Sequence, residues 1–317
     1  PDLTVTVTED LTGLAAVTGS AATTATTSTG VGSVAITEGS ITNANNANYD
    51  ITFVDGTLTI NRKGITVTAD DQVKTYGAAN PDLTVTVTED LTGLAAVTGS
   101  AATTATTSTG VGSVAITEGS ITNANNANYD ITFVDGTLTI NRKGITVTAD
   151  DQAKTYGAAN PDLTVTVTED LTGLAAVTGS AATTATTSTG VGSVAITEGS
   201  ITNANNANYD ITFVDGTLTI NRKGITVTAD DQAKTYGAAN PDLTVTVTED
   251  LTGLAAVTGS AATTATTSTG VGSVAITEGS ITNANNANYD ITFVDGTLTI
   301  NRKGITVTAD DQVKTYG

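Results

Sequence analysis

Cysteine, methionine, tryptophan and histidine are all absent from the 317-residue sequence. Without them the chain has no thiol nucleophile, no imidazole base, no soft metal ligand and no disulfide framework. It also lacks a signal peptide, a basic transit segment and any apolar run near the ~20 residues that cross a bilayer. These absences argue against most enzyme classes, so we expect no catalytic residues and no membrane insertion in this segment.

Basic residues are scarce. The sequence has 12 lysines and arginines against 32 aspartates and glutamates, which gives a net charge of −20. Binding to nucleic acid or to anionic lipid requires a basic patch that releases counterions. We therefore expect neither as a partner.

What the sequence has instead is repetition. The stretch TADDQVKTYGAANPDLTV, which begins at Thr68, returns with a period of 80 residues, and one position varies among the copies. That position is occupied by Val73, Ala153, Ala233 and Val313. A fixed period of this length indicates a tandem array of one small unit.

Apolar residues and threonines alternate along most of each copy. In residues 65–69 and 83–88 the aliphatic side chains fall on one face and the threonines on the other, which is typical of half-buried strands. Residues 111–117 show the same pattern. Helix is nearly excluded, because the asparagine-rich segment 123–130 could form one turn at most. The module is therefore predicted to be all-β.

A hairpin is predicted around Asp135-Gly136, which lies between two alternating runs. Pairing outward from this dipeptide places Phe133 opposite Leu138 on the apolar face, so the turn and the hydrophobic register agree. The same prediction applies to the copies at Asp55-Gly56, Asp215-Gly216 and Asp295-Gly296.

The strand pattern places complete modules at 64–143, 144–223 and 224–303. Residues 1–63 then form an incomplete module that lacks its first strand, and 304–317 repeat the first strand of a further module. Modules of this size balance burial against ordering entropy closely. A serial array in which each module packs on the next is therefore expected, as an elongated rod or fibre.

The terminal strand 304–317 would fray if its backbone groups were unpaired. We therefore expect it to be docked, and we expect the first module to be completed from outside. Two explanations are open. Either the sequence is a window on a longer polymer, or each subunit donates its last strand to a neighbouring copy, head-to-tail.

A family resemblance covers the whole repeat. The Tyr76-Gly77 pair, the Asn128-Tyr129 pair and the ending GTLTI at 136–140 resemble the YGX-type MBG repeat modules of very large bacterial surface proteins. The resemblance implies a structural role outside the cell or at its surface, and a β-rich fold of the immunoglobulin-like sandwich or β-grasp type. It fixes no catalytic residue. One departure is the near identity of the copies, since such repeats usually diverge.

Adjacent aspartates interrupt the chain after the first strand and are candidate calcium ligands, because Ca²⁺ prefers carboxylate oxygens. No EF-hand loop or glycine-rich calcium repeat is present, so a solvated bulge that discourages edge pairing is the favoured interpretation. No other cofactor is expected. The candidate metal ligands are Asp70, Asp71, Asp150, Asp151, Asp230 and Asp231, with the same pair at Asp310 and Asp311.

Four further residues carry predictions. Lys74 could form an amide crosslink with an Asn or Asp side chain, but an exposed lysine at a sheet edge is favoured. Val73 is expected at an edge or near a junction, because a valine-to-alanine change in a core costs about 1 kcal/mol or more. Tyr76 and Tyr129 are assigned to the core.

The function favoured by these patterns is a non-enzymatic structural array, a stalk or filament whose useful property is its length. Its partners would be neighbouring copies of itself. The alternative is an adhesin in which every module binds a host or matrix glycan or protein weakly and multivalency supplies avidity.

Overall fold

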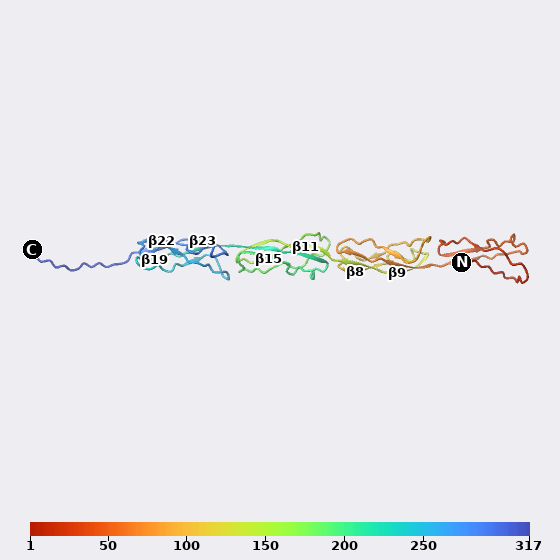
Figure 1. Cartoon of the computed structure of the whole chain (residues 1–317), viewed down its shortest axis with the longest axis horizontal. Helices are drawn as coiled ribbons and strands as arrows, with labels where there is room; N and C mark the ends of the chain where they lie inside the picture. Colours follow the sequence, from red (N-terminus) through yellow and green to blue (C-terminus); the bar gives the residue numbers. More distant parts are fainter. The chain divides into compact units, whose positions relative to one another are not determined.

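The computed structural model describes all residues 1–317, and its regular structure consists of strands only. The strands form a succession of small sheets, repeat by repeat (Figure 1). The all-β prediction is confirmed. The structure contains no helix with the length and hydrophobicity needed to cross a membrane.

Each complete repeat contains a three-stranded sheet with its first strand in the middle. In the second repeat this sheet has the order β6 (Val85–Val87), β4 (Lys63–Ala69), β9 (Tyr129–Val134). β4 pairs antiparallel with β6 and parallel with β9. Ile65 and Val67 are buried, and Thr66 between them is half-buried, so the predicted alternation is confirmed.

A four-stranded sheet completes the repeat. Its order is β5 (Gln72–Thr75), β10 (Gly136–Asn141), β8 (Gly112–Thr117), β7 (Ala102–Thr103). β10 pairs parallel with β5 and antiparallel with β8. β5 is an edge strand, and Val73 on it is 60% exposed, which confirms the prediction for the variable position.

The third and fourth repeats have the same two sheets. The strands of the third are β11 (Lys143–Ala149), β12 (Gln152–Thr155), β13 (Val165–Val167), β14 (Ala182–Thr183), β15 (Gly192–Thr197), β16 (Tyr209–Val214) and β17 (Gly216–Asn221). Those of the fourth are β18 (Lys223–Ala229), β19 (Gln232–Thr235), β20 (Val245–Val247), β21 (Ala262–Thr263), β22 (Gly272–Thr277), β23 (Tyr289–Val294) and β24 (Gly296–Asn301).

The first repeat has a single sheet, β1 (Ala22–Thr23), β2 (Gly32–Thr37), β3 (Gly56–Ile60), in that order. Its β2–β3 pairing matches the β8–β10 pairing of the second repeat, residue for residue. Residues 1–16 and 49–55 form no strand, although their copies in the second repeat contain β6 and β9.

The predicted hairpin at Asp135-Gly136 is wrong. β9 and β10 belong to different sheets, and the dipeptide is the point where the chain crosses between them. Gly136 is not in the left-handed region that a hairpin turn of this kind needs. It is required for space, because a Cβ there would lie 2.5 Å from the carbonyl oxygen of Ala69. The hairpins predicted at the other three Asp-Gly copies are wrong too, since no strand pairs across any of them.

By their internal contacts, the residues group into two compact units. One holds residues 1–143 together with 171–176 and 207–209, and the other holds the remaining residues. The contacts described below lie within one unit or the other.

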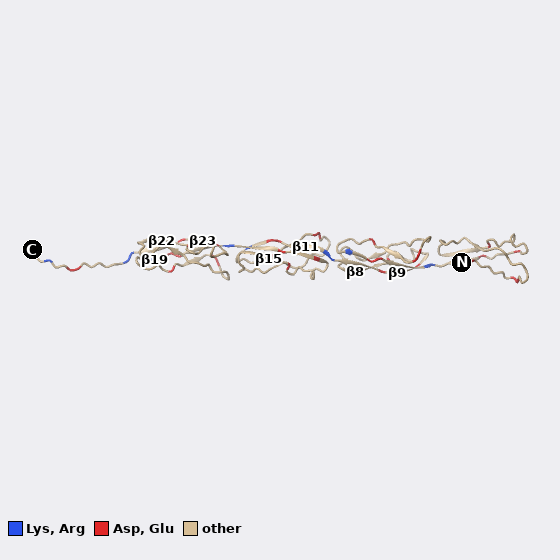
Figure 2. Cartoon of the chain, in the orientation of Figure 1, with Lys and Arg blue, Asp and Glu red and all other residues tan.

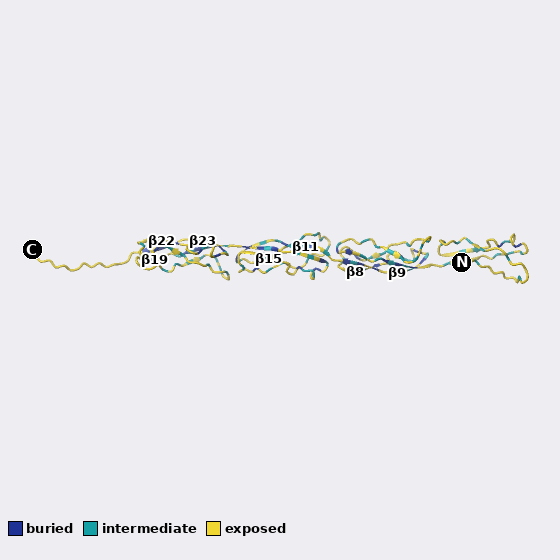
Figure 3. Cartoon of the chain, in the orientation of Figure 1, coloured by how far each residue is buried: buried dark blue, intermediate teal, exposed yellow.

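Residues 304–317 form no strand, and every one of them is exposed (Figure 1, Figure 3). The side chain of Val307 is 85% exposed, whereas its copy Val67 is fully buried. The expectation that this segment is docked is therefore wrong, in both of the versions given for it.

Candidate functional site at the repeat junction

The Tyr76-Gly77 pair follows β5 and runs beside the end of the four-stranded sheet. The backbone N–H of Tyr76 donates to Asn141 O at 2.8 Å, and that of Gly77 donates to Thr107 O at 3.1 Å. Gly77 has a φ of +86°, and a Cβ on it would lie 2.7 Å from a methyl group of Leu174. Both the backbone conformation and the close approach of the next repeat therefore require glycine here.

The ring of Tyr76 is buried against residues of the next repeat. It meets Tyr209 edge-to-face, with ring centroids 5.5 Å apart and an interplanar angle of 82°. Its hydroxyl oxygen accepts a hydrogen bond from the backbone N–H of Ala175 at 3.1 Å. The hydroxyl of Tyr209 donates to the carbonyl oxygen of the same Ala175. The two tyrosines thus form hydrogen bonds with both the N–H and the carbonyl oxygen of Ala175.

Asn208 completes the junction. Its Oδ1 accepts from the backbone N–H of Val111 at 2.9 Å, and its carbonyl oxygen accepts from the backbone N–H of Lys143 at 3.0 Å. One residue therefore contacts both the end of the second repeat and the strand that enters the third. The Tyr-Gly pair of one repeat and the Asn-Tyr pair of the next, which carry the family resemblance, form this junction together.

The second unit contains the same junction. Tyr156 and Tyr289 meet at 5.5 Å and 82°, and the hydroxyl oxygen of Tyr156 accepts from Ala255 N at 3.1 Å. Asn288 Oδ1 accepts from Val191 N at 2.9 Å. Both tyrosines belong to a continuous hydrophobic cluster that includes residues of two repeats. The neighbour completes the site, because Tyr236, which has no following repeat, is 43% exposed where Tyr76 is 2% exposed.

The electrostatics of the junction favour neutral phenols. Burial raises the pKa of Tyr209, and the nearby hydroxyl of Tyr76 raises it further. The same causes raise the pKa of Tyr289 beside Tyr156. A neutral hydroxyl donates one hydrogen bond and accepts others, so the chemistry available here is packing and hydrogen bonding between repeats.

Sequence reasoning correctly predicted that Tyr76 and Tyr129 are buried, and Tyr129 packs with Ile65, Val67 and Ile121 in the core of its own repeat. The prediction did not include the packing of Tyr76 on the following repeat. The missed signal is the position of Tyr76, which follows an edge strand and precedes a glycine. A large ring at that position has little of its own repeat left to pack against. The partner residues lie more than one repeat away in sequence, a separation that local patterns do not encode.

The prediction of an exposed Lys74 is wrong, because the side chain is 6% exposed. Along β5, Val73 points outward and Lys74 therefore points inward. Its ammonium group donates to three uncharged oxygens, which are Thr106 O at 2.6 Å, Asn80 Oδ1 at 2.8 Å and Ala78 O at 3.3 Å. It joins the loop after the Tyr-Gly pair to Thr106. The carboxylate that an amide crosslink requires is not among these partners.

The candidate calcium ligands are engaged with threonines. The carboxylate of Asp70 accepts from the hydroxyls of Thr84 at 2.6 Å and Thr86 at 2.8 Å, and these hydrogen bonds lower its pKa. The carboxylate of Asp71 accepts from the backbone N–H of Thr137 at 2.7 Å. The two neighbours therefore bind to different sheets. Equivalent bonds are made by Asp150 to Thr164 and Thr166, Asp151 to Thr217, Asp230 to Thr246, and Asp231 to Thr297.

The structure brings together no group of three or more acidic residues that could hold a metal ion. Calcium binding at the aspartate pairs stays a prediction. Isothermal titration of the chain with CaCl₂ tests it, and heats that disappear in the Asp70→Asn, Asp150→Asn, Asp230→Asn triple variant would support it.

The fold and the junction together define a class of protein, a tandem array of small all-β modules in which the Tyr-Gly pairs at 76–77 and 156–157 pack on the Asn-Tyr pair of the following module. The family model described as MBG domain (YGX type) matches residues 1–59, 65–139, 145–219 and 225–299. The chain belongs to this family, and the resemblance is confirmed. A comparison with curated proteins gives no match.

Proposed function

We propose that the chain is a non-enzymatic structural array, a segment of an extracellular stalk or filament of a bacterial surface protein. The observation that carries the proposal is the repeat junction. The same ring contact and the same hydrogen bonds join the second repeat to the third within one unit, and the third to the fourth within the other. Membership of the MBG family supports a structural repeat array.

The energetics of the array also support this role. In such arrays, stability is approximately the sum of the repeats' own terms and the nearest-neighbour interfaces. Here the interface includes an aromatic pair, worth about 0.5–1.5 kcal/mol beyond burial. Because the copies are almost identical, adding one adds the same module and the same interface. The length of the array therefore increases with the number of copies, and length is the property that we expect to matter for function.

Surface distribution of charge fits a solvated array. Acidic residues occur in every repeat, and basic residues are few (Figure 2). Like charge of this kind keeps neighbouring arrays apart in solution. It also disfavours lateral pairing of sheet edges.

A second candidate function is multivalent adhesion. Each copy presents the same exposed hydroxyl-bearing segment, which is 106–108 in the second repeat. Weak binding at four such segments would give avidity without a deep pocket. Glycan-array binding that rises steeply from one repeat to four would favour this function, and flat binding would leave the structural role.

The structural proposal is tested by distance distributions between spin labels in adjacent repeats. Tyr76→Ala should broaden the distribution across its junction, whereas Tyr76→Phe, which keeps the ring, should broaden it much less. An equally broad distribution in the unmodified chain would contradict a structural role for the junction. Surface location is tested separately, by antibody labelling and protease shaving of intact cells that make the protein.

A further inference from the structure

Two segments of the second repeat are paired along their whole length. One is residues 63–75, which contain β4 and β5, and the other is residues 129–141, which contain β9 and β10. β4 pairs parallel with β9, and β5 pairs parallel with β10. Each residue of the first segment is paired with the residue 66 positions later, in both sheets. We call the two segments together the parallel ribbon.

The ribbon stays paired where the chain crosses between the two sheets. The backbone N–H of Thr137 donates to Asp71 Oδ1 at 2.7 Å, so a side chain provides the acceptor at the same 66-residue offset. Gly136 lies so close to Ala69 that a Cβ on it would be 2.5 Å from the carbonyl oxygen. The close approach and the side-chain bond join the β4–β9 pairing to the β5–β10 pairing.

The chain enters the repeat at the start of the first segment and leaves it at the end of the second. Backbone hydrogen bonds join the segments at both places, from Lys63 N to Asn128 O at 3.0 Å and from Tyr76 N to Asn141 O at 2.8 Å. Tension along the array therefore pulls the first segment from its N-terminal end and the second from its C-terminal end. Because the segments are parallel, these two pulls are opposite and act along the strands, as a shear.

The ribbon is also present in the fourth repeat, within the other unit. β18 pairs parallel with β23, and β19 pairs parallel with β24, again at an offset of 66 residues. The backbone N–H of Thr297 donates to Asp231 Oδ1 at 2.7 Å. A Cβ on Gly296 would lie 2.5 Å from Ala229 O. The geometry at the crossing is therefore a property of the repeat.

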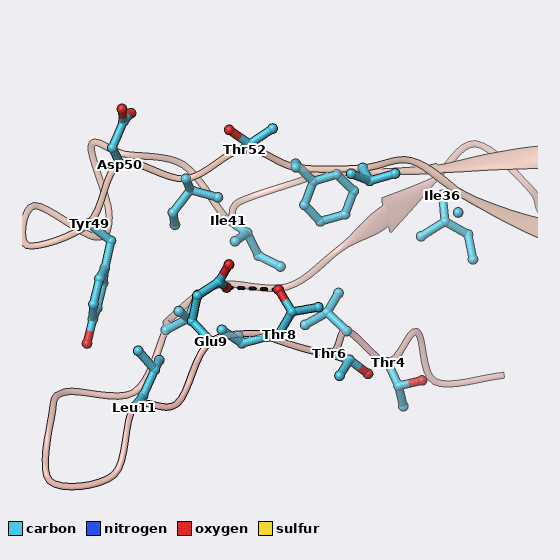
Figure 4. A pocket seen from close by; sticks show the side chains of 17 residues that line it. Thr4, Thr6, Thr8, Glu9, Leu11, Ile36, Ile41, Tyr49, Asp50 and Thr52 are labelled. Carbon is cyan, nitrogen blue, oxygen red and sulfur yellow. Dashed lines mark hydrogen bonds between the residues drawn. The ribbon is translucent and has the colours of Figure 1, made fainter.

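The first repeat shows that the second segment depends on its partner. Residues 50–54 are copies of 130–134, but no strand pairs with them and they form no strand themselves. Asp50 and Thr52 instead lie on one wall of a pocket of about 600 Å³, with Thr6 and Glu9 on the other wall (Figure 4). The strand structure of 130–134 therefore comes from pairing with β4.

We propose that the parallel ribbon is the element that carries tension through each repeat, so that the array resists being pulled apart as well as spanning a distance. Shear slides all paired residues of the ribbon in one step, whereas pulling two strands apart from one end breaks their pairing residue by residue. Breaking many hydrogen bonds together raises the barrier to unfolding, and forced unfolding is governed by the rate over that barrier. While the ribbon holds, the residues between its segments are not loaded.

The proposal deepens the proposed function, because it gives the structural array a mechanical task. It rests on the pairing within a repeat, whereas the spin-label test concerns the junction between repeats. A broad distance distribution across the junction would leave the shear geometry of each repeat unchanged. The failure of one proposal is therefore distinguishable from the failure of the other.

Single-molecule force spectroscopy on the full chain tests the proposal through the direction of pulling. The sequence has no cysteine, so two introduced cysteines define where the force acts. Arg62→Cys with Asn141→Cys loads the ribbon in shear, and Thr75→Cys with Asn141→Cys pulls the two segments apart from one end. All three positions are exposed. At one loading rate, the first rupture should need a several-fold higher force in the shear direction.

The two cysteine pairs form a matched comparison, since they share Asn141→Cys and leave every buried residue in place. Urea unfolding should give both chains the same free energy of unfolding, so a difference in rupture force reports the direction of loading. Equal rupture forces in the two directions would overturn the proposal.

Two glycine variants, each pulled through the shear pair of cysteines, give an independent test. Gly136→Ala places a Cβ 2.5 Å from Ala69 O, inside the ribbon, and Gly99→Ala places one 2.6 Å from Ser120 O, outside it. Both variants should lower the free energy of unfolding, because each forces a methyl group against a carbonyl oxygen. Gly136→Ala should also lower the rupture force, and the control Gly99→Ala should keep most of it.

An equal loss of rupture force in the two glycine variants would overturn the proposal, because the force would then follow stability alone. The comparison of pulling directions uses a repeat with an unaltered core. It therefore decides the proposal even if Gly136→Ala prevents its repeat from folding.

Discussion

Residues 1–60 and 81–140 have the same sequence, yet their burial differs. Leu138 is fully buried, whereas its copy Leu58 is half-buried, and Val5 is 47% exposed, whereas Val85 is half-buried. Both stretches keep the same pairing of the GSVAIT and GTLTI strands. The difference lies in residues 64–77, which complete the second repeat.

The core of a complete repeat is formed by two sheets, and β4 is the strand that pairs with both β6 and β9. Without a central strand, the flanking segments have no main-chain partners, and they form no strands. The sheet whose strands pair with each other survives on its own. The presence of residues 64–77 therefore increases the burial of the rest of the repeat.

The largest expected effect comes from making the second repeat resemble the first. Val67→Asp places a charge at a fully buried position in the middle of β4. Burial of an unpaired charge belongs to the class of changes that cost more than about 4 kcal/mol. Calorimetry should show one repeat melting well before the others, and Val73→Asp at the exposed edge should not. A single unchanged transition for Val67→Asp would contradict the role given to β4.

A smaller effect separates the two copies of one leucine. Leu138→Ala removes a fully buried side chain and should cost about 2–5 kcal/mol. Leu58→Ala, at a half-buried copy of the same position, should cost less than about half as much, because less area leaves water on folding. Chemical unfolding of the chain with each change measures both. Equal costs would mean that the two repeats have equally complete cores.

Buried Lys74 provides the next comparison. Lys74→Met removes three hydrogen bonds and leaves carbonyl oxygens short of a donor, which should cost about 1–3 kcal/mol. Lys314→Met, at the exposed copy, should leave the free energy of unfolding unchanged. Urea titration of the two variants measures the difference. An unchanged free energy of unfolding for Lys74→Met would show that the ammonium group is dispensable.

Asp70 makes stability depend on pH. Hydrogen bonds from Thr84 and then Thr86 lower its pKa below the ordinary 3.8. A depressed pKa contributes stability above the unfolded value, and this contribution is lost as the pH falls through the folded value. The melting temperature should therefore fall below about pH 4. Asp70→Asn should flatten this fall and Asp310→Asn, at the exposed copy, should not; identical pH profiles for all three chains would contradict the assignment.

The smallest effect is expected at the variable position. Val73→Ala changes an exposed edge residue and should alter stability by less than about 0.5 kcal/mol. Alanine occupies the same position in the third and fourth repeats. Thermal melting measures the shift, and a loss of several degrees would show that Val73 is packed.

Local patterns predicted the strands well because alternation reports directly on burial. Ile65 and Val67 were placed on the correct face, and Val73 was placed at an edge from the chemistry of its alanine copies. The Asp-Gly hairpin failed because the same dipeptide suits a tight turn and a crossing between sheets. At Gly136 the close approach of Ala69 O decides the matter, and that contact joins residues distant in sequence.

The junction could not be predicted for a related reason. Tyr76 and Tyr209 lie in different repeats, and nothing local says that one packs on the other. The prediction for Lys74 failed because lysine is usually exposed. Its burial here depends on three oxygens that lie outside its own strand. In both cases the motif residues were identified correctly, but their roles depend on tertiary contacts.

The most direct test of the central claim, that residues 64–77 complete the core of a repeat, is amide hydrogen exchange by NMR on chains with segmental isotope labels in residues 1–60 or 81–140. The account predicts that amides of 136–140 exchange far more slowly than those of 56–60, although their sequences are identical. Equal protection of the two stretches would contradict it.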